Sequence, residues 1–335
     1  LLVNAAGPWI DFVNQSMGLE TPFISGTKGS HLILDNPRLK QAIGEEEFFF
    51  ENKDGRIVLI FPLFDKVLVG STDIRIKHPD RAVITEEEID YFFKMIGWVF
   101  PGIQVDRSQI IYTFSGVRPL QRSEGGATGT ISRDHVVKVL EAGELLDIPV
   151  LSLVGGKWTS FRAFSEQAAD RVLAFLDLPR RVSTWNLPIG GSKDYPGSLA
   201  EREQLIAAYV EGSSLDQHLV EDLFSWYGTK TPQIIAAHGD QLVPLKSLPE
   251  LTRGELIWIL EGEDVLHLDD LILRRTVLAK LGKIFPESLQ EVADICASSL
   301  GWTPAEKAAE IARYQEILFK NHRLNYAEYV PKVGP

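Results

Sequence analysis

One stretch near the middle of the chain constrains its fold more than any other. An apolar run over residues 149–154 ends at Gly155 and Gly156, and Lys157 follows directly. Apolar residues then recur at spacings of three and four as far as Phe175, which predicts an amphipathic helix. A strand, two glycines and a helix in this order direct free N–H groups and a partial positive charge to one place. The stretch therefore predicts a site for an electron-rich group.

The phosphates of a nucleoside triphosphate do not fit this stretch. A nucleotide-binding P-loop requires the pattern G-x-x-x-x-G-K-[ST]. Here Leu151 stands in place of the first glycine and Trp158 in place of the hydroxyl residue. The chain also has no G-x-G-x-x-G fingerprint after a strand, which dinucleotide-binding domains use. The glycine-rich run at 125–129 lacks that spacing, and a polar turn explains it better.

The first residues predict a second close approach. An apolar run there is followed by Ala5, Ala6 and Gly7, and then by Pro8 at a suitable first helical position,. Small residues after a strand allow either a ligand or another backbone to come close, and both explanations stay open. Because the chain opens with Leu1 inside an apolar run, we expect it to be a fragment of a longer protein.

Between residues 22 and 147, short apolar runs are separated by turn residues, which is typical of an antiparallel sheet. One helix interrupts the sheet, because Thr85 and Glu88 form a capping box,. Its apolar face contains Ile89, Phe92, Phe93 and Ile96. The strands are expected at residues 29–34, 48–50, 56–62, 67–71, 110–114 and 136–140.

Glycine and proline residues between 179 and 197 mark a linker, and the rest of the chain follows a helical pattern,. This predicts a separate all-helical region, so the chain as a whole belongs to the α+β class. Helices are expected at residues 199–211, 216–227, 231–238, 252–261, 264–280, 285–300 and 303–320.

Composition limits the partners that the chain can have. Its 335 residues suffice for two or three domains, and its net charge of −12 repels nucleic acid and anionic membranes,. The single Cys296 lies in an apolar helical pattern and excludes an internal disulfide,. No run approaches the roughly 18 apolar residues of a membrane span. We expect a cytoplasmic protein without a nucleic-acid partner, whose membrane contacts are peripheral and at the inner face.

Five basic residues stand in or beside strand-like segments: Lys28, His31, Arg118, Arg133 and Lys157. For each alone a structural role is at least as good an explanation. Arginine in apolar surroundings is costly unless it meets an anion, and its planar fork suits phosphate or carboxylate. Together these residues indicate a pocket for an anionic substrate. His31 suits a proton acceptor near neutral pH, although a buried and hydrogen-bonded histidine is an equal explanation.

Other chemistries find no support in the sequence. The seven histidines are scattered without HExxH or any paired spacing, so we expect no metal site. A serine hydrolase of the G-x-S-x-G type is not indicated, because that motif does not occur,.

The motifs together resemble one family, the FAD-dependent glycerol-3-phosphate dehydrogenases and the related glycerophosphate oxidases. They occur in the family's order and cover nearly the whole chain. A terminal stretch, VLHLDDLILRRT at 265–276, resembles the family's C-terminal helical domain. The other carriers are VNAAGPW (3–9), TKGSH (27–31), DGR with GSTD (54–56 and 70–73), YTFSGVRPL (112–120), ISRDH (131–135) and GGKWTSFR (155–162).

The resemblance implies an antiparallel substrate-binding domain at 18–147 and a helical domain at 198–335, joined by a linker at 181–197. Residues 1–17 and 148–180 would be the remnant of a glutathione-reductase-like FAD-binding domain. The family's N-terminal G-x-G-x-x-G unit is absent from the sequence. We therefore expect this chain alone to bind FAD weakly or not at all and to be inactive.

The resemblance also implies roles for individual residues. The expected reaction is oxidation of sn-glycerol 3-phosphate at C2 to dihydroxyacetone phosphate, with hydride passing to the flavin and electrons to quinone, oxygen or another acceptor. A homodimer is our hypothesis for the assembly. Catalysis would use His31, Arg118 and Lys157, substrate binding Lys28, Arg118 and Arg133, and flavin binding Ala5, Ala6, Gly7, Trp9, Gly155, Gly156, Lys157, Trp158 and Thr159.

Two alternatives stay open. One is another flavin oxidase of the same fold acting on amino or hydroxy acids, in which an arginine binds a carboxylate. The TKGSH and SGVRPL contexts and the helical region speak against it. The other is a non-catalytic interaction module, in which the helical region mediates contacts with a partner or with a second copy.

Overall fold

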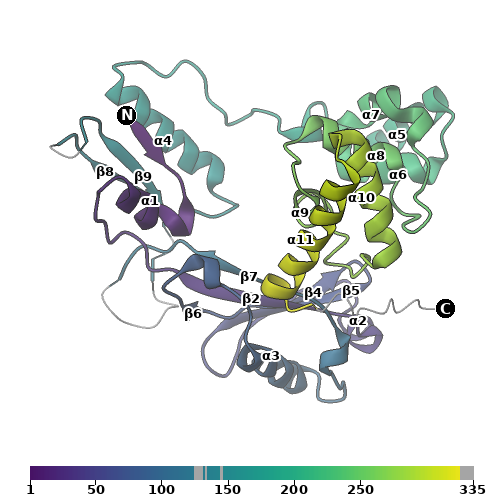
Figure 1. The fold of residues 1–335 in the computed structure, drawn as a ribbon, viewed down its shortest axis with the longest axis horizontal. Helices are drawn as coiled ribbons and strands as arrows, with labels where there is room; N and C mark the ends of the chain where they lie inside the picture. Colours follow the sequence, from purple (N-terminus) through teal and green to yellow (C-terminus); the bar gives the residue numbers. More distant parts are fainter. Residues whose placement is uncertain (124–130, 133, 144–145, 325–335) are drawn as a thin grey trace. The chain divides into compact units, whose positions relative to one another are not determined.

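The computed structural model describes residues 1–123, 131–132, 134–143 and 146–324. It forms two compact units. Of the described residues, unit 1 holds Leu1–Trp185 and the chain from Ile317 to Leu324, and unit 2 holds Asn186–Glu316. The boundary between Trp185 and Asn186 falls inside the predicted linker. Sheets occur in unit 1 and helices make up unit 2 (Figure 1), so the α+β class is confirmed.

The smaller sheet of unit 1 has the strand order β1-β9-β8. β1 (Leu2–Asn4) runs parallel to β9 (Val150–Val154), and β8 (Val136–Leu140) pairs antiparallel with β9. α1 (Ile10–Ser16) follows β1 and α4 (Phe161–Phe175) follows β9 (Figure 1). The prediction that residues 136–140 complete the larger antiparallel sheet is wrong. Their alternation defines a strand but not its partner.

The larger sheet has six strands, and each of its pairings is antiparallel. Its strand order is β3-β4-β5-β2-β6, and β7 pairs with the other edge of β2. These strands are confirmed close to where alternation predicted them; only the two-residue β6 was not expected. Their bounds are β2 Thr27–Leu34, β3 Phe48–Glu51, β4 Ile57–Leu63, β5 Lys66–Gly70, β6 Ile74–Arg75 and β7 Ile110–Arg118.

Successive side chains of a strand point to opposite faces, and the two faces of this sheet differ. One face packs against α3 (Glu86–Val99) through Leu32, Ile60 and Val69 and contains the core of the unit (Figure 1). We call it the closed face. The opposite face carries His31, and we call it the open face. The predicted capping box of α3 is confirmed, whereas α2 (Pro37–Ile43) was not predicted.

Unit 2 is entirely helical in the part of the chain that the structure describes. The helix expected at 264–280 is only α9 (Leu268–Ile272), and the chain continues in turns, where the Thr276 hydroxyl donates to the Ile272 carbonyl. The other helices are α5 Leu199–Ser213, α6 Gln217–Tyr227, α7 Thr231–His238, α8 Arg253–Gly262, α10 Pro286–Leu300 and α11 Pro304–His322. The part of α11 up to Glu316 belongs to unit 2.

The last turn of α11 belongs to unit 1, because the chain from Ile317 is part of that unit. This differs from the predicted helical region of 198–335.

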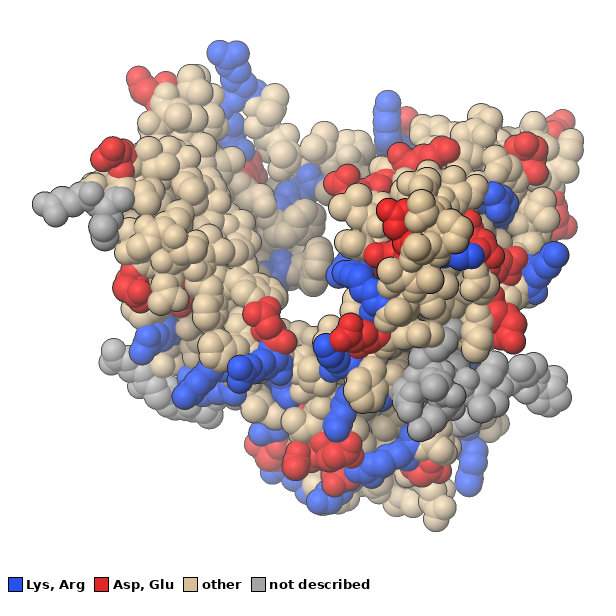
Figure 2. Space-filling model, viewed as in Figure 1, with Lys and Arg blue, Asp and Glu red and all other residues tan. Residues whose placement is uncertain are grey.

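Asp and Glu side chains are interspersed with Lys and Arg on the face that Figure 2 shows. Among the described helices, none combines the length and the apolar composition that crossing a membrane requires.

Candidate active site

Two of the predicted segments meet at one edge of the smaller sheet. β1 ends at Asn4 and β9 at Val154, and the two strands are parallel with Asn4 opposite Ser152. Their carboxyl ends therefore point to the same edge, where α/β sheets bind their ligands. Residues 5–9 follow the first strand and residues 155–159 follow the second. The structure thus brings the two halves of the predicted flavin site together.

The paired glycines are required by the path of the backbone. Gly155 and Gly156 have φ angles of +83° and +100°, which side chains rarely tolerate. A Cβ at Gly155 would lie 2.7 Å from the Asp134 carbonyl oxygen. The helix that the apolar spacing predicted is confirmed as α4, which begins at Phe161. In the intervening turn the Lys157 N–H donates to the Ser160 hydroxyl at 3.2 Å.

The side chains at this edge leave it open. Lys157, Trp158 and Thr159 are exposed, and Trp158 is 92% exposed. Trp9 is 40% exposed and its indole N–H donates to Asp80 at 2.9 Å. Small residues and exposed aromatic rings at the carboxyl ends of parallel strands fit a planar cofactor. The cofactor-binding set, which includes Ala5, Ala6 and Gly7, stays a prediction.

A buried hydrogen-bond network holds this edge in place. The Asn4 amide donates to the Asn14 side-chain oxygen at 2.7 Å and to the Ile10 carbonyl at 3.0 Å. The Asn14 amide in turn donates to the Ser152 hydroxyl at 3.1 Å. The network joins β1, α1 and β9, and a satisfied buried network makes such a junction rigid. These residues were missed, because nothing in the sequence links positions 4, 14 and 152.

Arg118 lies at the end of β7 on the open face of the larger sheet. Its guanidinium donates to the Ser71 hydroxyl at 2.8 Å and to the Thr72 carbonyl at 3.1 Å. The Asp73 carboxylate lies 3.4 Å away. The guanidinium folds back over Gly29, where a Cβ would overlap it. The GSTD segment therefore forms the cradle of Arg118, which the sequence analysis did not foresee.

His31 lies on the same face, two residues after Gly29 on β2. Its imidazole stacks on the Phe114 ring, with centroids 4.6 Å apart and planes within 5°. Gly70 is opposite on β5, and a Cβ there would overlap the imidazole. Within the described residues, the buried Nδ1 atom of His31 has no hydrogen-bond partner. A buried polar atom without a partner calls for a functional explanation.

The environment keeps His31 neutral. Burial and the positive charge of Arg118 lower the pKa of His31 from 6.5 to about 4, because both disfavour the imidazolium. At neutral pH the ring is therefore able to accept a proton. His31 and Arg118 thus place a neutral imidazole near a fixed cation on one face of the sheet.

Lys28 points to the opposite face. Its ammonium lies 2.6 Å from the Glu88 carboxylate and donates to the Val83 carbonyl at 2.7 Å. Glu88 also accepts hydrogen bonds from Ser30 and Thr72. Burial alone would raise the pKa of Glu88, but the hydrogen bonds from Lys28 and its other donors lower it overall. The geometry thus gives Lys28 a structural role. Arg133 lies outside the described residues.

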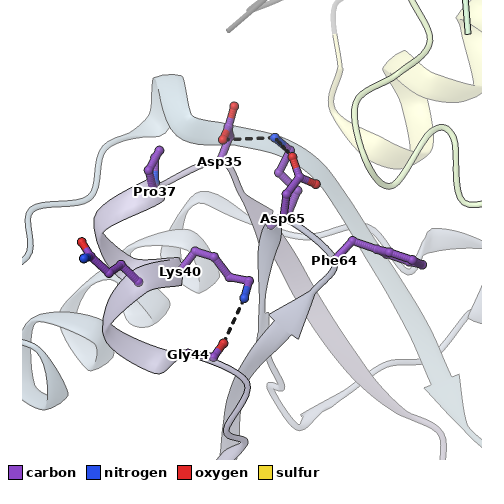
Figure 3. A pocket seen from close by; sticks show the side chains of 8 residues that line it. Asp35, Pro37, Lys40, Gly44, Phe64 and Asp65 are labelled. Carbon is purple, nitrogen blue, oxygen red and sulfur yellow. Dashed lines mark hydrogen bonds and ion pairs between the residues drawn. The ribbon is translucent and has the colours of Figure 1, made fainter. Parts of the chain in front are cut away.

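A surface hollow of about 670 Å³ lies elsewhere in unit 1, between α2 and the β4–β5 turn (Figure 3). Its two lysines already have partners. Lys66 lies 3.2 Å from Asp35 and 2.8 Å from Asp65, and Lys40 donates to the Gly44 carbonyl at 3.0 Å. It contains none of the predicted site residues, and we do not assign the active site to it.

Comparison with known sequences gives two family matches. Residues 1–143 match the family described as "FAD dependent oxidoreductase". Residues 182–307 match the family described as "C-terminal domain of alpha-glycerophosphate oxidase". The first matched segment includes every strand of the larger sheet, and the second includes most of the helices of unit 2.

Curated relatives match over nearly the whole chain. A glycerol-3-phosphate dehydrogenase of Synechocystis is 30% identical over 96% of this chain and 59% of its own length. A probable mitochondrial glycerol-3-phosphate dehydrogenase of Dictyostelium discoideum is 27% identical over 95% of this chain and 50% of its own length. The chain therefore spans little more than half the length of these relatives.

A solved structure supports the fold. The glycerol-3-phosphate dehydrogenase of Bacillus halodurans, solved with FAD, aligns with a TM-score of 0.74. The alignment covers 95% of this chain and 62% of that chain, at 21% sequence identity. At this identity the likeness concerns the fold alone, and it includes both units.

Proposed function

Because the chain belongs to the family of FAD-dependent oxidoreductases that includes the glycerol-3-phosphate dehydrogenases, we propose that it supplies the substrate face of such an enzyme. The reaction is oxidation of sn-glycerol 3-phosphate at C2 to dihydroxyacetone phosphate. The observation that carries the proposal is the pairing of neutral His31 with Arg118 on one face of the sheet.

Each of these residues has a distinct task. Arg118 binds an anionic oxygen of the substrate, for which its cradle of Ser71 and Thr72 fixes the direction of the guanidinium,. His31 accepts the proton of the C2 hydroxyl through its neutral imidazole,. Lys157, whose side chain is exposed at the cofactor edge, adds a positive charge on the substrate's other side.

FAD, when bound, supplies the acceptor for the hydride. Residues 5–9 and 155–159 would hold it at the open edge of the smaller sheet. The sequence contains no G-x-G-x-x-G fingerprint, so this chain lacks the backbone N–H cradle that grips a pyrophosphate. We therefore expect weak or no FAD binding by this chain alone. Stoichiometric flavin absorbance in the purified chain would contradict this.

The test joins this chain to the N-terminal segment of the Synechocystis relative and measures reduction of an artificial electron acceptor. Glycerol 3-phosphate should be oxidised, and glycerate, which carries a carboxylate instead of a phosphate, should not. Activity on glycerate alone would favour an oxidase of hydroxy acids. Quinone and oxygen are then compared as acceptors.

The site assignment is tested by Arg118→Lys in the same chimera. Lysine cannot reproduce the two-pronged hydrogen bonding of arginine, so kcat/KM should fall by roughly 10²–10³-fold. The matched control is Arg107→Lys, because Arg107 is an exposed arginine that pairs with Glu86 and Asp90 on α3. The assignment is wrong if Arg118→Lys and Arg107→Lys have equal kcat/KM.

A further inference from the structure

The last turn of α11 lies on the edge of β7 that pairs with no strand in the part of the chain that the structure describes. β2 pairs with one edge of β7 along its length, and His322 meets the other. The Thr113 hydroxyl donates to the His322 carbonyl at 2.7 Å. The Nδ1 atom of His322 lies 2.7 Å from the Thr113 carbonyl oxygen. A carbonyl oxygen only accepts hydrogen bonds, so Nδ1 carries a proton and donates it.

The second ring nitrogen of His322 contacts the neighbouring residue of β7. Its Nε2 atom lies 3.2 Å from the Tyr112 hydroxyl, and the two rings stack with centroids 4.6 Å apart. Burial raises the pKa of Tyr112 well above its ordinary value, so the hydroxyl keeps its proton in this contact. Beside it, Arg323 donates to the Ile84 carbonyl at 3.2 Å and holds this turn in place.

This contact lies next to the platform of His31. Tyr112 and Phe114 are two residues apart on one strand and share a face, with ring centroids 6.3 Å apart. Phe114 in turn stacks flat against the His31 imidazole. An edge strand without a neighbour has unpaired backbone groups and moves more easily than a paired one. Pinning β7 at residues 112 and 113 therefore limits how far Phe114 moves.

We propose that His322 is a positioning residue for His31, acting through β7 and Phe114. The inference rests on the proposed function, because it assigns a residue from the end of the chain to the same site. A displacement of about 1 Å at a catalytic group is enough to lower a rate roughly 100-fold. The near-parallel stack of His31 on Phe114 is the feature that His322 protects.

The test observes the stack directly, by NMR of the 335-residue chain with ¹³C-labelled histidine. Ring protons of His31 that lie over the face of Phe114 are shifted upfield by its ring current. The spectrum of His31→Gln assigns the signal, and Phe114→Leu gives its position without the stack. In His322→Ala the signal should move most of the way to that position. The signal of His218, an exposed residue of α6, should not move.

Two conservative variants separate positioning from folding. His322→Asn places an amide N–H near the position of Nδ1 and should keep the Thr113 bond and most of the upfield shift. His322→Gln places its amide near Nε2 and should lose both. If His322→Ala does not fold, the Asn and Gln variants decide, and equal His31 shifts in the two would overturn the proposal. An unmoved His31 signal in folded His322→Ala would also overturn it.

The kinetic readout comes from the chimera described above. His322→Ala should lower kcat more than it raises KM, because it displaces the proton acceptor and leaves Arg118 in its cradle. His322→Asn should recover most of the loss. Absence of turnover in the unmutated chimera would contradict the proposed function, whereas the NMR result for His322 would stand by itself.

Discussion

The two faces of the larger sheet use positive charge in opposite ways. On the closed face the Lys28 ammonium is 2.6 Å from Glu88, and the two side chains are 6% and 3% exposed. On the open face the Arg118 side chain is 28% exposed, and the Asp73 carboxylate is 3.4 Å away. Both cations were predicted to bind substrate. What separates them is burial, because the Lys28–Glu88 pair is enclosed in the core whereas the Arg118 side chain is partly exposed.

The two faces also differ in whether their buried polar atoms have hydrogen-bond partners. Glu88 accepts hydrogen bonds from Lys28, Ser30, Thr72 and the Thr85 N–H, so its carboxylate is fully used. On the open face the Nδ1 atom of His31 has no partner among the described residues. Satisfied buried groups hold a fold together, and a buried group left without a partner calls for an explanation.

Breaking the ion pair of the closed face should have the largest effect. In Glu88→Gln the Lys28 ammonium stays buried without a carboxylate, which costs about 3–5 kcal/mol of the free energy of unfolding. Urea unfolding measures this loss. The control is Glu86→Gln in the same helical turn, whose side chain is 52% exposed and whose loss should be about 0–1 kcal/mol. Equal losses in the two variants would show that the closed face does not depend on this pair.

The open face should instead make the free energy of unfolding depend on pH. The pKa of His31 is 6.5 in the unfolded chain and about 4 in the folded one. The unfolded chain therefore binds a proton between these values that the folded chain does not. The stabilisation is complete above pH 6.5 and is lost as the pH falls towards 4, by a total of about 3 kcal/mol.

Urea unfolding at pH 7.5 and pH 4.5 checks this dependence on pH. His31→Gln has no such titration, so its stability should fall less than that of the unmutated chain between the two pH values. A His31 signal that titrates near pH 6.5 in the folded chain would contradict the assignment of a neutral, buried ring.

Two glycines of the open face provide a matched pair. A Cβ at Gly70 would overlap the His31 imidazole, whereas a Cβ at Gly116 would meet nothing within 4 Å. Gly70→Ala should therefore cost about 1–3 kcal/mol and displace His31 from Phe114. Gly116→Ala should stay within about 0.5 kcal/mol of the unmutated chain. Thermal unfolding measures both, and similar values would mean that the face tolerates side chains in general.

Local patterns predicted the parts of the fold that local physics determines. Alternation located the strands of the larger sheet, and the spacing of Thr85 and Glu88 located the start of α3. The same alternation places Lys28 and His31, three residues apart, on opposite faces. The division of roles between these two residues was therefore already implied by TKGSH, although we assigned both to the substrate.

Contacts between distant parts of the chain could not be predicted in this way. The capping box located Glu88 on its helix but did not show that it meets a lysine 60 residues earlier. The contact of His322 with Tyr112 spans 210 residues, and no local pattern carries it. The partner of β8 was misjudged for the same reason, since a strand's alternation is silent about its neighbours.

The smallest expected effect tests whether the two faces are coupled through Thr72. Its hydroxyl donates to Glu88 at 2.6 Å and accepts from the Ser30 N–H at 3.0 Å, while its carbonyl accepts from Arg118. Thr72→Val keeps the shape but leaves the Ser30 N–H without an acceptor, which costs about 1–2 kcal/mol. Thr72→Ser keeps the hydroxyl and should lose less.

Coupling predicts a second consequence of Thr72→Val in the chimera. The carbonyl that orients Arg118 is no longer held from the closed face, so KM for glycerol 3-phosphate should rise a few-fold while kcat changes less. Thr72→Ser should restore KM. If Thr72→Val lowers stability and leaves KM unchanged, the closed face supports the fold without orienting Arg118, and the two faces act independently.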